Sequence, residues 1–135
     1  MKEAIELAGH RTYPGVSQAV RVGNQLHLSG QVAIDAQGTL VGEDDAQVQA
    51  EQCFRNIEQL LRAAGASAND VVKLTCFLVD RAHFAAYASA KADFLGDASV
   101  APAGTAVIVA GLASPGLLME VEALAEIPSP TDSVT

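Results

Sequence analysis

Apolar and polar residues alternate in two neighbouring stretches near the start of the chain. The stretches cover residues 18–22 and 25–32, and a Gly23-Asn24 pair separates them. Alternation with a period of two is typical of strands with one buried face, and a glycine beside an asparagine favours a tight turn. The pattern therefore predicts a β-hairpin. A turn-rich stretch follows, and we expect it to return to a short strand over 39–41.

Helical periodicity begins after Asp44 and Asp45, two residues suited to a helix N-cap. Apolar residues then recur every three or four positions until Gly65: Ala50, Cys53, Phe54, Ile57, Leu60, Leu61 and Ala64. This spacing predicts an amphipathic helix. A second helix is predicted from about residue 82 to residue 95, with Asp80 as its cap and Gly96 as its end.

Three later stretches, 71–79, 105–110 and 117–127, are rich in β-branched or alternating apolar residues and predict strands. In the last of them Glu120 and Glu122 share one face of the strand. The other face carries Met119, Val121 and Ala123. We expect the apolar face to pack on the helices and the glutamates to face away from them.

The order of the predicted elements is β-β-α-β-α-β-β, which is typical of an α+β protein. Two helices on one face of a mixed sheet give a two-layer α/β sandwich. We expect one domain over residues 1–127 and a disordered tail over 128–135. Half of the residues are hydrophobic, and one sheet face lacks a cover. Both features predict an oligomer whose subunits share a site.

The composition limits the classes of partner. Sixteen acidic and eight basic residues give the 135-residue chain a formal charge of −8, which repels phosphate backbones and anionic membranes. The sequence has no apolar run of transmembrane length and does not open with the pattern of a secretory leader. We therefore expect a cytoplasmic protein that binds neither nucleic acid nor membranes.

Histidines and cysteines indicate neither a metal site nor thiol chemistry. His10, His27 and His83 lack the spacing of a zinc-binding set, so no metal and no cofactor are predicted. Cys53 and Cys76 lie within apolar patterns, and we expect them to be reduced core residues. Among the histidines, His27 lies on a predicted strand and is the one we expect nearest a cleft.

Four segments follow one another in a recognisable order: SGQV (29–32), AAGASANDVVKLTCFLVD (63–80), APAGTAV (101–107) and MEVEALA (119–125). Over roughly residues 15–127 the chain resembles the RidA family, also called YjgF/YER057c/UK114. The resemblance implies a chorismate-mutase-like fold, assembled as a homotrimer with three clefts between neighbouring subunits. It also implies hydrolysis of reactive enamines and imines, such as 2-aminoacrylate, to 2-oxo acids and ammonia without a cofactor.

Four positions of the family's cleft carry small or apolar residues in this chain. In the active branch of the family an arginine clamps the substrate carboxylate through two parallel hydrogen bonds, and Gly104 occupies that position. The family's pocket tyrosine, helix asparagine and cysteine correspond to Val16, Ala88 and Ala106. These four replacements predict a wider and more apolar cleft.

Two matching positions keep polar side chains. Glu120 corresponds to the carboxylate that positions or activates the attacking water, and an apolar cleft can raise the pKa of such a group. The alternative for Glu120 is an outward-facing strand residue or a partner in an intersubunit ion pair. Ser29 is expected to hydrogen-bond a ligand or the backbone, because no histidine accompanies it in a nucleophile elbow. Tyr87 is a further candidate for the lining, with core or surface packing as its alternative.

The cleft is accordingly predicted to have a neutral lining with a single glutamate. Without a clamp, a small carboxylate substrate should bind about 30-fold to several thousandfold more weakly. Arg11, Arg21 and Arg81 remain candidates to replace the clamp from another direction, and Arg11 is the best placed of them.

The leading hypothesis is a diverged hydrolase of the enamine/imine deaminase type, acting on a substrate larger or less acidic than 2-aminoacrylate. The alternative is a non-catalytic trimer that binds a small molecule or has a regulatory role. Endoribonuclease activity, a third label attached to parts of the family, is disfavoured by the net charge of −8 and the lack of a histidine pair.

Overall fold

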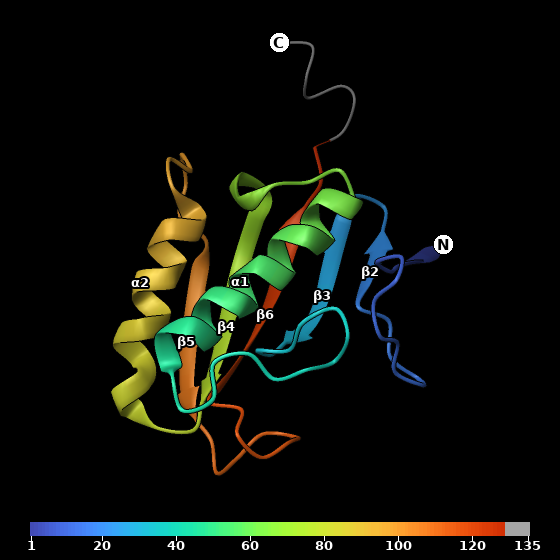
Figure 1. Ribbon diagram of the computed structural model, residues 1–135. Helices are drawn as coiled ribbons and strands as arrows, with labels where there is room; N and C mark the ends of the chain where they lie inside the picture. The colour runs from blue at the N-terminus through green and yellow to red at the C-terminus, as the bar shows by residue number, and fades with distance from the viewer. Residues whose placement is uncertain (129–135) are drawn as a thin grey trace.

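The computed structural model describes residues 1–128 and shows a six-stranded sheet with two helices packed on one face (Figure 1). The strand order is β1-β2-β3-β6-β4-β5, in which β4 and β5 are parallel and all other neighbours are antiparallel. The predicted two-layer α+β sandwich with a mixed sheet is therefore confirmed. The strands are β1 (Lys2–Ile5), β2 (Ala19–Val22), β3 (Gln25–Gln31), β4 (Val71–Leu78), β5 (Ala103–Ile108) and β6 (Met119–Glu126).

The predicted hairpin is formed by β2 and β3, and Gly23 adopts a φ of 60° in the turn between them. Positive φ is accessible to glycine at little cost, so this residue permits the tight reversal. Strand β1 was not predicted. Its four residues are too few to establish a period, and the strand forms because β2 offers it an antiparallel edge.

Both predicted helices are present. Helix α1 (Ala46–Ala63) begins after Asp45, whose side chain accepts a hydrogen bond from the Val48 backbone N–H at 3.1 Å. Helix α2 (Phe84–Leu95) follows a short 3₁₀ turn at Arg81–His83, and Asp80 caps that turn instead of the α-helix itself. A second short 3₁₀ turn, Ala68–Asp70, leads into β4.

The core lies between the sheet and the two helices. On β6 the side chains of Met119, Val121 and Ala123 are buried, whereas Glu120 and Glu122 lie on the opposite face, as predicted. The stretch 39–41, expected to be a strand, forms only an isolated bridge between Ile34 and Leu40. The tail prediction, 128–135, falls outside the described residues except for Pro128.

Gln49 on α1 joins two loops to the helix from within the core. It is fully buried, and its Nε2 donates to the carbonyls of Gly42 at 3.0 Å and Gly116 at 2.9 Å. Its Oε1 accepts from the Leu118 N–H at 2.9 Å. A buried amide with both donors and an acceptor satisfied stabilises the segment that leads directly into β6. The sequence pattern gave no sign of this contact.

Candidate functional site

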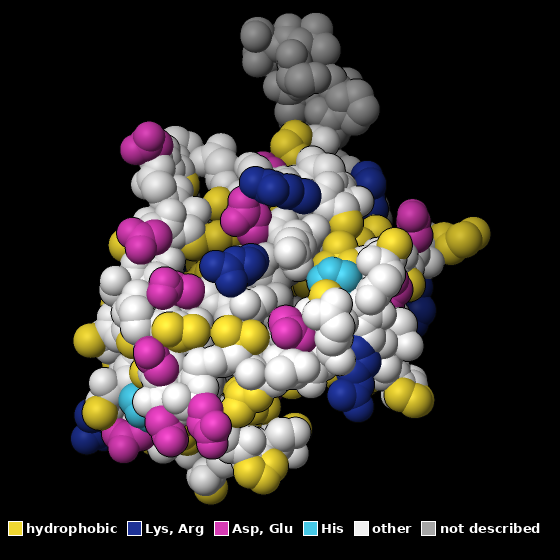
Figure 2. All heavy atoms as spheres, in the orientation of Figure 1, with side chains coloured by type: hydrophobic (Ala, Val, Ile, Leu, Met, Phe, Trp, Pro, Cys, Tyr) yellow, Lys and Arg dark blue, Asp and Glu magenta, His cyan; other side chains and the backbone are white. Residues whose placement is uncertain are grey.

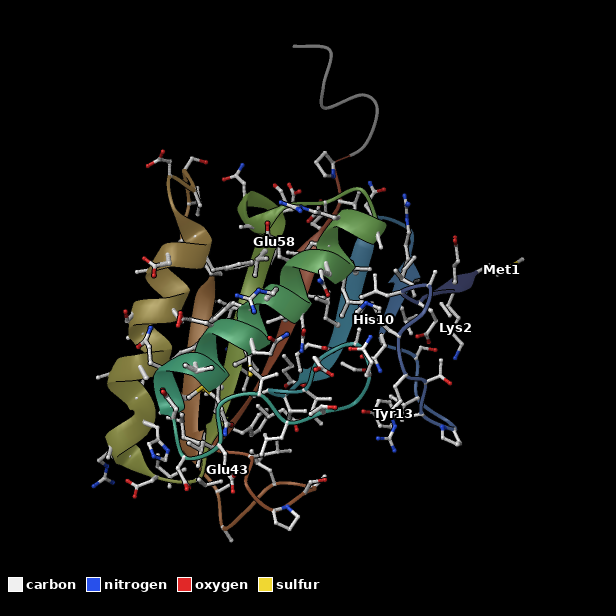
Figure 3. All side chains as sticks on the ribbon, in the orientation of Figure 1. Met1, Lys2, His10, Tyr13, Glu43 and Glu58 are labelled. Atoms are coloured by element: carbon white, nitrogen blue, oxygen red, sulfur yellow. The ribbon has the colours of Figure 1, made fainter. Side chains whose placement is uncertain are left out.

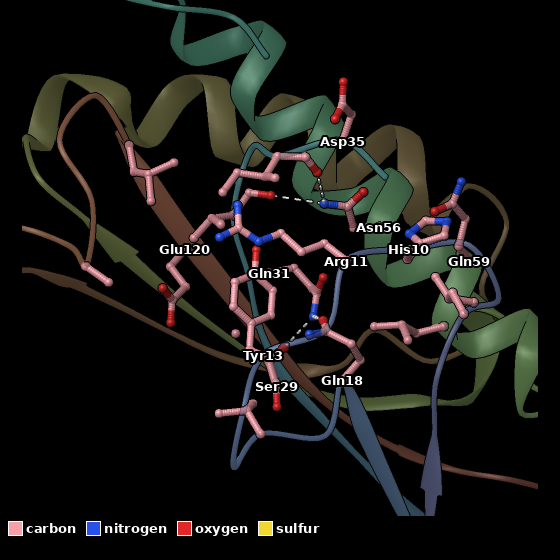
Figure 4. Close-up of a pocket in the computed structure, with 18 of the residues that line it drawn as sticks. His10, Arg11, Tyr13, Gln18, Ser29, Gln31, Asp35, Asn56, Gln59 and Glu120 are labelled. Carbon is pink, nitrogen blue, oxygen red and sulfur yellow. Dashed lines mark hydrogen bonds between the residues drawn. The ribbon is translucent and has the colours of Figure 1, made fainter. Parts of the chain in front are cut away.

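A pocket of about 280 Å³ opens beside the end of β3, near the lower size limit of about 300 Å³ for small-molecule sites (Figure 4). It is bounded by the β1–β2 loop, the segment after β3, helix α1, the loop before β6 and the start of β6. Its lining includes Leu7, His10, Arg11, Tyr13, Val16, Gln18, Ser29, Gly30, Gln31, Val32, Ile34, Asp35, Asn56, Gln59, Leu60, Ala113, Ser114, Leu117 and Glu120. Val16, Ser29 and Glu120 are thus brought together.

Glu120 reaches this pocket beside Gly30. A β-carbon at residue 30 would lie 2.7 Å from Cδ and 2.8 Å from Cγ of Glu120, so the carboxylate occupies space that only glycine leaves free. The register between β3 and β6 shifts by one residue between Leu28 and Gln31. Such a shift is typical of a β-bulge, in which one strand carries an extra residue. The bulge and the glycine together admit the glutamate.

The Glu120 carboxyl has a raised pKa. The main cause is burial, which disfavours the charged form, and the nearby negative charge of Glu122 adds to it. Glu122 is itself exposed and does not line the pocket. A carboxylate with a pKa moved toward neutrality is a stronger base than an ordinary one and remains available to accept a proton.

Ser29 acts on the protein backbone, one of the two roles predicted for it. Its Oγ donates to the Ser17 carbonyl at 2.6 Å, and its N–H donates to the Gln18 carbonyl at 2.9 Å. Buried Gln31 donates from Nε2 to the Ser29 carbonyl at 3.0 Å and to Gln18 Oε1 at 3.1 Å. These bonds fix the loop that carries Val16 against β3.

Asn56 on α1 stabilises the opposite wall. Its Nδ2 donates to the carbonyls of Val32 and Ile34, both at 3.0 Å. Sequence reasoning did not select Asn56, Gln18 or Gln31. The SGQV motif that contains Gln31 was recognised, but Gln31 itself was not selected. Asn56 was missed because an isolated amide in a helix carries no spacing signal.

The neutral lining expected for the cleft between subunits stays a prediction, whereas the pocket within one chain carries charged side chains. Arg11, Asp35 and His10 line it together with Glu120, and the labelled His10 and Tyr13 lie in the loop beside β2 (Figure 3). His10 thus reaches the pocket of this chain, whereas His27 lies exposed on β3 outside that pocket. The sequence pattern of the hairpin does not show in which direction the β1–β2 loop folds.

Three predicted residues lie elsewhere on the chain. Gly104 and Ala106 are on β5, paired with Leu74 and Cys76 of β4, and Ala88 is on α2. None of the three lines the pocket around Glu120. Strand β5 forms the sheet edge opposite β1. Within one chain the predicted site residues therefore form two groups, one at the pocket around Glu120 and the other on β5 and α2.

Tyr87 packs in the core of this chain. It is 3 % exposed, stacks on Phe54 with ring centroids 5.7 Å apart, and does not line the pocket. Burial raises the pKa of its hydroxyl. Within a single chain Tyr87 is therefore a core residue, which was the alternative to a place in the cleft lining.

The two cysteines are free and buried, as expected for core residues. Burial raises the pKa of the Cys76 thiol to about 12 and also raises that of Cys53, so both remain protonated and unreactive. Within residues 1–128, no group of three or more histidine, cysteine, aspartate or glutamate side chains is placed to hold a metal ion.

The helical face of the molecule is predominantly acidic. Figure 2 shows Asp and Glu side chains spread over it, with a few isolated Lys and Arg side chains between them. A continuous basic strip, which nucleic-acid binding uses, is not seen on this face. No helix in the described part of the chain is both long and apolar enough to span a membrane.

The fold and the site define an α+β sandwich with a pocket of about 280 Å³ that contains a half-buried glutamate. The chain belongs to the RidA/YjgF family, because the family model described as Endoribonuclease L-PSP matches residues 10–127. A RutC family protein from Pyrococcus horikoshii is 38 % identical over 109 residues, which cover 81 % of this chain and 84 % of that protein.

Solved structures agree with this assignment. RidA from a Psychrobacter species has a TM-score of 0.82 and 36 % identity, covering 93 % of this chain and 99 % of that one. TdcF from E. coli, solved with bound serine, has a TM-score of 0.84 and 27 % identity, covering 93 % of this chain and 99 % of that one. The fold implied by the sequence resemblance is thereby shown.

Proposed function

We propose that this protein hydrolyses the C=N bond of an imine, or of the enamine in equilibrium with it, and that Glu120 activates the water. The observation that carries the proposal is a half-buried carboxyl with a raised pKa inside a pocket of small-molecule size. The serine held by the similar TdcF supports a small substrate with the functional groups of an amino acid. Free, protonated cysteines are compatible with the cytoplasmic location predicted from the sequence.

The reaction needs one proton acceptor near the attacked carbon. The water oxygen bonds to the imine carbon while Glu120 takes a proton from the water. Glu120 then returns this proton to the nitrogen, and the neutral tetrahedral adduct carries a hydroxyl and an amine on one carbon. In the second step Glu120 takes the hydroxyl proton and passes it to the amine, so the carbonyl forms as the C–N bond breaks and ammonia leaves. The balanced outcome is one carbonyl compound and one ammonia for each imine and water.

Ammonia release tests this activity directly. Imines generated in situ by amino-acid and amine oxidases are supplied to the protein, and ammonia is measured above the spontaneous rate. We expect faster release from imines larger than that of 2-aminoacrylate and little acceleration with 2-aminoacrylate itself. No acceleration across the whole panel would leave ligand binding without turnover as the function.

We also propose that the working site lies between copies of this chain. Every residue of edge strand β5 is exposed, and the uncovered sheet face carries Val22 at 46 %, Val72 at 46 % and Val107 at 38 % exposure. A neighbouring copy that places its β5 and α2 beside Glu120 would bring Gly104 and Ala88 to the pocket. The division of the predicted residues into two groups supports this arrangement.

The solution mass tests the assembly. Light scattering after gel filtration should give three times the 13.9 kDa of one chain. Replacing Val107 with Asp places a charge on the sheet face and should yield single chains. Val100, 76 % exposed in the loop before β5, provides the matched control, and Val100→Asp should remain trimeric. A wild-type protein that elutes as one chain would exclude a shared cleft.

A further inference from the structure

The pocket contains an arginine that forms no ion pair with a carboxylate of residues 1–128. Arg11 lies in the β1–β2 loop, and Figure 4 shows its side chain extending into the pocket toward the side where Glu120 lies. No carboxylate of residues 1–128 lies within 4.0 Å of its guanidinium. Arginine is suited to bind a carboxylate through two parallel hydrogen bonds, provided that no internal partner occupies it.

The neighbours of Arg11 hold its side chain in an extended position. The guanidinium carbon lies 5.3 Å from the centroid of the Tyr13 ring, a cation–π contact. On the other side, a β-carbon at Gly38 would lie 2.8 Å from Cδ and 2.9 Å from Nη1 of Arg11. The Arg11 N–H donates to the Ala36 carbonyl at 3.1 Å. An arginine placed in this way loses less conformational entropy when it binds a ligand.

The two acidic residues of the pocket do not neutralise Arg11. Asp35 Oδ1 accepts hydrogen bonds from the backbone N–H groups of Gln37 and Thr39, both at 3.0 Å. An ion pair with a guanidinium would lower the pKa of Glu120, whereas that pKa is raised. The guanidinium is therefore available to an anion that enters from solvent.

We propose that Arg11 binds a carboxylate of the substrate and so determines the substrate class. This inference rests on the proposed C=N hydrolysis: the substrate is an imine or enamine that carries an acid group. The acid group is contacted from the β1–β2 loop, whereas position 104 lies on β5 and carries no side chain. A carboxylate contact at Arg11 argues against the less acidic substrate, one of the two alternatives predicted from the sequence.

The test measures binding of the carbonyl products, which needs no turnover. Pyruvate, 2-oxoglutarate, 4-oxopentanoate and the methyl ester of 4-oxopentanoate are titrated into isotope-labelled protein, and the amide and arginine Nε–H signals are followed by NMR. At least one acid should bind the wild type and shift the Arg11 signal. Arg11→Gln should weaken that acid at least tenfold, and Arg11→Lys, which keeps the charge, should weaken it less.

Arg21 supplies the matched control. It lies on β2 outside the pocket, and its Nε donates to the Gly23 carbonyl at 2.9 Å. Arg21→Gln removes the same charge and should leave acid binding unchanged. The methyl ester should not distinguish the wild type from Arg11→Gln. Equal affinity of the acids for both proteins, or no binding of any acid to the wild type, would overturn the assignment.

The failure of this inference can be distinguished from failure of the proposed reaction. If acids bind through Arg11 but no imine is hydrolysed, the role of Arg11 holds and the hydrolase proposal fails. If ammonia is released with the same KM by the wild type and Arg11→Gln, the hydrolase proposal holds and the role of Arg11 fails. Glu120→Gln should retain acid binding in either case.

Discussion

Replacing Glu120 with Gln is expected to lower kcat/KM for imine hydrolysis by about 10²–10⁴-fold, the usual contribution of a positioned general base. Glutamine is nearly the same size and fits the space beside Gly30, so the pocket is preserved. It cannot accept a proton from water at ordinary pH. The measurement is ammonia release under steady-state conditions with the best imine of the panel.

Glu122→Gln is the control for this variant. Glu122 lies two residues further along the same face of β6 and is exposed, so its replacement removes an equal charge outside the pocket. The activity of the wild type should rise with pH as Glu120 ionises. Because the charge of Glu122 raises the pKa of Glu120, Glu122→Gln should move this acidic limb to lower pH.

The pH profile also shows which role Glu120 has. A Glu120→Gln protein that keeps the rate and the acidic limb of the wild type would contradict general-base catalysis by this residue. The outward-facing alternative considered for Glu120 would then describe it better. A large loss of rate in both Glu120→Gln and Glu122→Gln would instead indicate a general effect of charge on the face of β6.

Gln49→Leu is expected to lower the free energy of unfolding by about 2–4 kcal/mol, because it leaves three backbone partners without their hydrogen bonds. Leucine fills a similar volume, so the loss comes mainly from Gly42, Gly116 and Leu118. Gly116 is exposed, and water can replace part of its bond. Urea unfolding monitored by circular dichroism gives the value.

Two further variants make the Gln49 result specific. Gln47→Leu, at a half-buried position of the same helix, should change stability much less, because Gln47 takes no part in the three bridging hydrogen bonds. Gln49→Glu keeps the acceptor for Leu118 but places a buried acid against the carbonyls of Gly42 and Gly116, so it should destabilise the fold at least as much as Gln49→Leu. A change in Gln49→Leu no larger than that in Gln47→Leu would show that the bridge does not hold the loops.

The elements that could be predicted are those whose residues show a local period. Helix α1 has an Asp45 cap and regular apolar spacing, and the β2–β3 hairpin has alternation on both sides of Gly23. The alternation along β6 also placed Glu120 and Glu122 on the face away from the helices. Strand β1 was missed because a four-residue strand depends on the edge that β2 offers it.

The site was only partly predictable, because some of its residues lie in contiguous motifs and others are brought in by tertiary contacts. The resemblance to the family identified Glu120 and Ser29, whose motifs are contiguous in sequence. The positions of Arg11 and Asn56 depend on how a loop and a helix meet the end of β3, and no spacing encodes that meeting. The charge of the pocket in one chain could not be predicted, because a guanidinium on a long side chain can enter a pocket from a neighbouring loop.

The sequence by itself determined the fold class, the family, the acidic character of the chain and the strand face on which Glu120 lies. These properties follow from composition, from short-range periodicity and from contiguous motifs. Only the tertiary structure decided that Gly30 makes room for the carboxylate, that Gln49 fastens two loops, and that Arg11 shares the pocket with Glu120. Such contacts join residues far apart in the chain, and their geometry exists only once the backbone has folded.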